Sequence, residues 1–155
     1  MLLATDRKAK VRLRRLARLD FTQIKAKLCS EMPGWNAEKA ELIEKWYRRF
    51  LQVILFHPQA KIVPNTLVDD FWHAHILDTK KYMLDCQNVF GHFVHHEPSY
   101  GEEKLEGGYD ETNALFRETF GEDQTVLEPS RAGKKCRKKC RRKCGSIDGN
   151  CASGY

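Results

Sequence analysis

Residues 66–96, TLVDDFWHAHILDTKKYMLDCQNVFGHFVHH, decide how the chain can fold, because they combine an apolar helical pattern with five of the six histidines. At about 100° per residue, polar and apolar side chains of this stretch share one sector of a helix. That sector contains Leu67, Val68, Phe71, Trp72, His75, Asp78, Tyr82, Asp85, Cys86, Val89 and Phe90. We therefore predict a largely enclosed helix over about 66–90, with ionisable groups on its buried side.

His73 and His75 cannot bind one ion together while this segment is helical, because residues two apart point about 200° apart. His75 and Asp78 are three apart and can converge. After Gly91, which can stop the helix, a short return segment can bring His95 and His96 back over them. We therefore predict a metal site made of His75, Asp78 and one or both of His95 and His96. Further ligands or supporting groups are expected among Trp72, His73, Tyr82, Asp85 and Cys86.

Two imidazoles and a carboxylate suit a divalent metal, either non-haem iron with open positions or catalytic zinc with a bound water. The same residues also fit a purely structural role, in which each imidazole bonds to Asp69, Asp85 or a backbone carbonyl, since buried polar groups must find partners. Proton chemistry without a metal is a third alternative. For His73 the expected partner is a nearby aspartate, Asp69 or Asp70.

Four helices are expected along residues 1–130, which we predict to form one all-α domain arranged as a compact bundle. Besides the helix over 66–90, the apolar spacing predicts helices over about 6–30 and 37–57. Asn36 can cap the second of these, and Asn65 or Thr66 can cap the third. Residues 101–108 read as an acidic loop, and Asp110 as the cap of a last helix that ends before Gly121.

The net charge of +6 is unevenly distributed along the chain. Residues 1–20 and 131–155 are basic, whereas the body between them is acidic, so the ends can contact nucleic acid or a membrane surface, or fold back on the body. The tail 131–155 has too little apolar surface to fold and is predicted to be disordered. It holds four thiols that could bind a soft metal: Cys136, Cys140, Cys144 and Cys151. Without a secretory signal or a membrane-length apolar run, the chain is expected to be cytoplasmic.

The central stretch resembles the glycine-rich domain-containing protein-like family. The resemblance rests on an Asp-x-Trp-His-x-His core ending at His75 and on a Tyr-x-x-Asp-Cys motif that begins at Tyr82. It covers roughly residues 60–100, including Phe90-Gly91 and His95-His96. It implies a helical domain found in bacterial proteins and in larger plant proteins, of which the plant members are associated with development and stress and have been suggested to bind RNA. The chain lacks the long glycine-rich region of those plant relatives.

The residues and their pattern predict a small metal-binding helical protein with a His/Asp site on the central helix. A metal-dependent oxidoreductase, using iron or zinc, is the more specific hypothesis. The alternative is a non-catalytic module that binds RNA, DNA or another protein through its basic termini. The sequence leaves open whether the protein is an enzyme.

Overall fold

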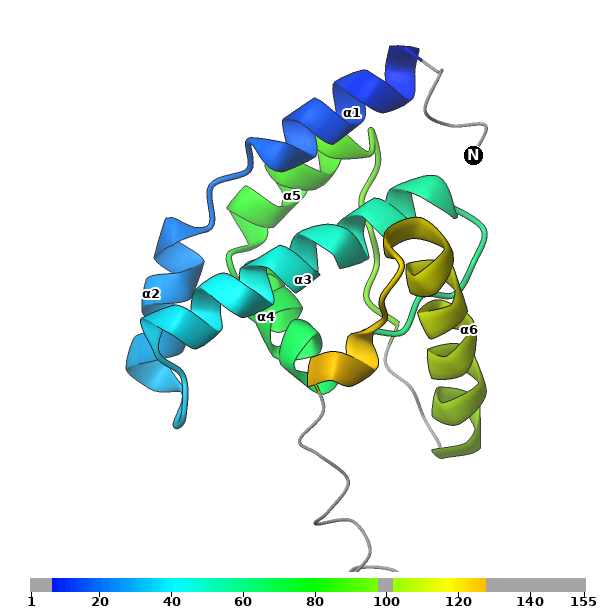
Figure 1. Ribbon diagram of the computed structural model, residues 1–155. Coiled ribbons are helices and arrows are strands. Elements are labelled where there is room, and N and C mark those ends of the chain that lie inside the picture. Colours follow the sequence, from blue (N-terminus) through cyan, green and yellow to red (C-terminus); the bar gives the residue numbers. More distant parts are fainter. Residues whose placement is uncertain (1–6, 98–101, 128–155) are drawn as a thin grey trace, which may run out of the picture.

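The computed structural model describes residues 7–97 and 102–127, with the side chains of 102–106 excepted. Over these residues the chain forms helices and no strand, which confirms the all-α fold (Figure 1). The elements are α1 (Arg7–Ala17), α2 (Thr22–Glu31), α3 (Ala37–Phe56), α4 (Thr66–Leu77), α5 (Thr79–Val89), α6 (Glu102–Phe120) and a 3₁₀ turn, η2 (Gln124–Leu127). The expected tail, with Cys136, Cys140, Cys144 and Cys151, lies outside the described residues.

The prediction of four helices is wrong in number because two of the expected helices are each divided in two. The first division separates α1 from α2. Arg48 on α3 donates to the backbone oxygens of Leu16 (2.7 Å) and Leu19 (2.6 Å), and so satisfies carbonyl groups where α1 ends. Asp20 then accepts from the backbone nitrogen of Thr22 at 2.9 Å, at the start of α2. The break lets Phe21 enter the core with only 1% of its surface exposed.

The second division falls at Asp78, inside the stretch that the sequence predicts to be one helix. Asp78 has φ −82° and ψ 70°, outside the helical region, and its side chain accepts from the backbone nitrogen of Lys81 at 3.3 Å. The residue thus ends α4 and caps α5. Because the two helices differ in direction, the side-chain sectors calculated for one continuous helix do not apply across Asp78 (Figure 1).

Helix α3 runs through the middle of the fold and packs against α1, α2, α4 and α6. Asn36 caps it as predicted, accepting from the backbone nitrogen of Lys39 at 2.8 Å. Its buried face carries Ala40, Ile43, Trp46, Tyr47, Phe50, Leu51 and Val53. None of the described helices is both long and apolar enough to cross a membrane.

The C-terminal helix begins earlier than predicted, at Glu102, so residues 102–108 form helix instead of a loop and Asp110 is no cap. This helix and η2 hold the connector between α3 and α4 by buried hydrogen bonds. Val63 N donates to Thr112 Oγ1 (2.8 Å), and Asn65 N donates to Gln124 Oε1 (2.7 Å). Thr112 and Gln124 are fully buried. Thr112 lies within the last helix that the sequence predicts, whereas Gln124 lies beyond it, where the apolar pattern stops and no packed segment is indicated.

Gly108 lets α6 approach the connector, and this contact gives a test of the packing. A Cβ at Gly108 would lie 2.9 Å from Val63 Cγ2, whereas one at Gly107 meets nothing within 4 Å. We expect Gly107→Ala to raise the free energy of unfolding by about 0.5–1 kcal/mol through helix propensity. Gly108→Ala should lower the free energy of unfolding by about 1–3 kcal/mol, because the added methyl group overfills the packed contact with Val63. Urea denaturation measures both, and equal stabilisation by the two substitutions would contradict the packing described.

Candidate metal centre

His75 is the centre of a buried hydrogen-bond network that joins three helices. Its side chain, 1% exposed, lies on α4. Nδ1 is 2.9 Å from the Tyr47 hydroxyl on α3, and Nε2 is 3.0 Å from Asp85 Oδ2 on α5. Lys81, one turn before Asp85, also donates to Oδ2 at 2.7 Å. Both ring nitrogens of His75 are therefore occupied by protein groups.

The hydrogen bonds fix which nitrogen of His75 carries the proton. Tyr47 has no acceptor other than His75 among the described residues, so its hydroxyl donates to Nδ1. Nε2–H then donates to Asp85. Burial raises the pKa of Tyr47 well above its ordinary value, which keeps the donor protonated. Burial alone would raise the pKa of Asp85, but hydrogen bonds from His75 and Lys81 outweigh it and hold that pKa below 3.8.

A second buried contact fastens the segment after α5 to α4. Tyr82 accepts a hydrogen bond from Trp72 Nε1 (2.9 Å) and donates to the backbone oxygen of Val94 (2.6 Å). Gly91, at φ 79°, makes the turn that ends α5, as the sequence predicts. Cys86 is 3% exposed beside Tyr82, and burial raises the pKa of its thiol, so it is a poor nucleophile. The return segment is therefore held at a defined position across α4.

This return segment places His96 against two residues of α4. Asp69 and His73 are four apart and share one face of the helix. His96 Nε2 lies 3.0 Å from His73 Nε2 and 3.0 Å from Asp69 Oδ1, and His73 Nε2 lies 3.8 Å from Asp69 Oδ2. The side chains of Asp69, His73 and His96 are 32%, 51% and 22% exposed. Unlike the network around His75, this cluster is open to solvent.

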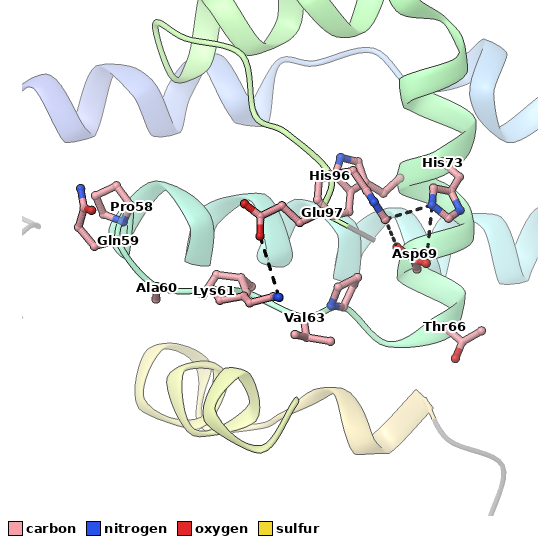
Figure 2. A pocket seen from close by; sticks show the side chains of 13 residues that line it. Pro58, Gln59, Ala60, Lys61, Val63, Thr66, Asp69, His73, His96 and Glu97 are labelled. Carbon is pink, nitrogen blue, oxygen red and sulfur yellow. Dashed lines mark hydrogen bonds and ion pairs between the residues drawn. The ribbon is translucent and has the colours of Figure 1, made fainter. Parts of the chain in front are cut away.

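The cluster lies at one end of a pocket of about 660 Å³ between the α3–α4 connector and the return segment (Figure 2). The connector residues 58–64 form one wall, with Lys61 and Glu97 4.0 Å apart across the opening. Trp72 contributes an aromatic surface, and its ring centroid lies 4.5 Å from that of His96. The pocket is of the size that small molecules occupy. A small molecule in it could therefore reach an ion held by the cluster.

The structure separates the residues that the sequence predicts to act together. His75 is buried and bonded to the half-buried Asp85, Asp78 caps α5, and His95 is exposed beside Phe93. In the described part of the chain, the group of three potential ligands whose atoms all lie within 4.8 Å is Asp69, His73 and His96. His73 and His75 lie on different sides of α4 and the return segment brings back an imidazole, both as predicted. The sequence underestimated His73 because its partner, His96, is 23 residues away.

The chain belongs to the family described as UCP032817-like, which matches residues 11–122 and so covers the whole cluster. It is also 30% identical over 83 residues to the protein named Glycine-rich domain-containing protein 1 of Arabidopsis thaliana. That alignment covers 48% of this chain but only 10% of the plant protein. The predicted resemblance to the glycine-rich domain-containing proteins is thus confirmed. No solved structure matches the chain.

Removing the Tyr47 hydroxyl tests the buried network. Tyr47→Phe leaves His75 Nδ1 without its donor in a fully buried position, at nearly constant volume. We expect the free energy of unfolding to fall by about 1–3 kcal/mol, the cost of an unsatisfied buried group. Urea denaturation gives this value. The same substitution at Tyr82 should have a comparable effect, whereas no loss at Tyr47 would show that the hydrogen bond does not stabilise the fold.

Asp85 should make the stability depend on pH in acid. Its pKa is lower in the folded state, so its contribution is present above the ordinary value of 3.8 and is lost as the pH falls through the lowered value. We expect Asp85→Asn to cost about 1–3 kcal/mol at pH 7 and progressively less below pH 3.8. Denaturation of both proteins across this range measures the difference. A difference that stays constant or grows in acid would contradict the assignment, and Asp110→Asn, at an exposed site, is the control.

Proposed function

We propose that this protein is a metal-binding helical domain whose ion is held by Asp69, His73 and His96. The observation that supports this most directly is the convergence of two imidazole nitrogens and a carboxylate at one open position. A zinc ion 2.0–2.1 Å from two nitrogens, at bond angles of 90–110°, holds those nitrogens roughly 2.8–3.4 Å apart. The separation of 3.0 Å between His73 and His96 fits this range. Asp69 Oδ1, which lies 3.0 Å from His96 Nε2, would supply the third ligand.

The surroundings of the cluster favour an ion over a purely structural role. His96 Nε2 lies 3.0 Å from both His73 Nε2 and Asp69 Oδ1, and its single N–H can be directed well at only one of them, whereas a cation attracts all three atoms. All three side chains are also partly exposed, so water can reach them and bonds within the cluster are not their sole source of hydrogen bonds. By contrast, the imidazole of His75 is buried and fully satisfied, so a structural role accounts for it.

An ion with three protein ligands keeps positions for water or a substrate, as in catalytic zinc and non-haem iron sites. Here those positions can be reached from the adjoining pocket. This arrangement supports metal-dependent chemistry on a small molecule, and the metal-dependent oxidoreductase expected from the sequence is one form of it. The metal is the first part of the proposal to test, because any such reaction depends on it.

Zinc titration of single variants tests the ligand set. The protein, purified without a histidine tag and with Cys136, Cys140, Cys144 and Cys151 replaced by serine, is titrated by calorimetry. We expect His73→Ala and His96→Ala each to weaken zinc binding by at least about 10–100-fold, the loss already seen when groups that only support ligands are removed. His95→Ala is the matched control, because His95 is exposed and adjacent to His96.

The result distinguishes this cluster from the site centred on His75. His75→Ala should lower stability but leave zinc binding by the folded protein within a few-fold of the parent. The proposal fails if the parent protein takes up no zinc, or if His95→Ala weakens binding as much as His96→Ala does. It fails equally if His75→Ala removes more metal than His73→Ala.

A further inference from the structure

Helix α1 carries a concentration of positive charge that the metal site does not use. Residues 7–18 contain seven lysines and arginines and no acidic residue. All seven side chains are exposed: Arg7, Lys8, Lys10, Arg12, Arg14, Arg15 and Arg18. Exposed basic residues are common on protein surfaces. They attract an anionic partner more strongly where no acidic group of the protein neutralises them.

Three of these cations, Lys10, Arg14 and Arg18, are not neutralised by the acidic groups that the structure describes. Among the described residues, no acidic side chain lies within ion-pair distance of Lys10, Arg14 or Arg18, and Arg15 donates to the backbone oxygen of Asn88. Ion pairs are formed by cations on other elements, among them Lys25, Lys27, Arg48, Arg49, Lys61, Lys81 and Arg117. These three cations therefore do not fold back onto described acidic groups, which is one alternative that the sequence leaves open for the basic ends.

The arrangement of α1 on the fold directs this charge outward. Ala9 and Leu16 are buried where the helix packs on α3 and α5. At 100° per residue, Lys10 and Arg14 follow one another along the opposite side, and Arg18 stands in the turn directly after the helix. In Figure 1 the helix lies along the edge of the fold, with α5 beside it. The outer side of α1 is thus a row of cations supported by a packed helix.

We propose that α1 binds the phosphate backbone of a nucleic acid. A row of lysines and arginines without acidic partners is the footprint that a polyanion requires. A bilayer is less suited, because the apolar side of α1 is already packed in the core and Val11, 38% exposed, is the large apolar side chain left outside. No aromatic residue lies on α1 to stack on bases, so binding follows charge and not sequence.

The experiment compares two full-length variants with equal charge. In the first, Lys10, Arg14 and Arg18 are replaced by glutamine, which leaves the Arg15 contact to Asn88 intact. In the second, Lys27, Lys45 and Lys80, which are exposed on α2, α3 and α5, are replaced in the same way. Binding of a labelled, mixed-sequence 20-nucleotide RNA is measured by fluorescence anisotropy over a series of salt concentrations. Circular dichroism confirms that both variants are folded.

We expect the parent to bind RNA more weakly as salt rises, and the α1 variant to lose at least about tenfold in affinity at low salt. Its plot of log affinity against log salt should also be shallower by about 2, since each lost phosphate contact removes about 0.7 from the slope. The control variant should stay close to the parent. Equal losses in both variants, or no loss in the α1 variant, would overturn the proposal. So would binding to vesicles of phosphatidylcholine and phosphatidylserine in place of RNA.

Discussion

The fold depends on a buried imidazole that must keep both of its ring nitrogens hydrogen-bonded. His75 meets this requirement by joining Tyr47 on α3 to Asp85 on α5 from its own place on α4. Phe21, between α1 and α2, packs edge-on against the same ring at a centroid distance of 5.1 Å. A polar group at this depth is costly unless every partner is in place, so the network favours one arrangement of the helices over other ways of packing the same apolar surface.

The open cluster depends on this buried framework. Asp69 and His73 belong to the same helix as His75, and Trp72 lies between them in sequence, so the contacts that fix α4 also fix these ligands. His96 comes from a segment with no regular structure, and its position depends on the Tyr82 hydroxyl bound to Val94. On the other side of the pocket, Thr112 and Gln124 hold the connector. One short stretch therefore contains a buried histidine that supports the fold and exposed histidines that this framework positions.

The sequence predicted what depends on local chemistry. The helical class, the cap at Asn36, the stop at Gly91 and the opposite directions of His73 and His75 all follow from neighbouring residues. It failed at residues 18–21, because that turn is stabilised by Arg48, which reaches the end of α1 only in the fold. It also failed at Asp78, where a local cap on Lys81 N interrupts an apolar pattern that continues through both helices. The sequence named His96 as a candidate ligand beside His75 and Asp78, and did not group it with Asp69 and His73. Asp69 and His73 form an ordinary helical pair, and nothing local shows that His96 completes it.

Family membership and charge add different information. The UCP032817-like match spans the helices that form both the network and the cluster, whereas the similarity to the plant protein covers a tenth of that protein's length. The basic helix α1 lies partly within the matched region, which begins at residue 11. It is positively charged, whereas the body of the chain is acidic. The metal cluster and the basic helix involve different residues, so each proposal can fail without the other.

The most direct test of the account is a long-range ¹⁵N–¹H correlation spectrum of the histidine side chains, recorded before and after zinc is added. This measurement reports the protonation and metal coordination of each imidazole separately. The account predicts that His75 is an Nε2–H tautomer that zinc does not change, while the Nε2 signals of His73 and His96 alone shift on coordination. A shift at His75, or none at His73 and His96, would contradict the division between a buried structural histidine and an open metal site.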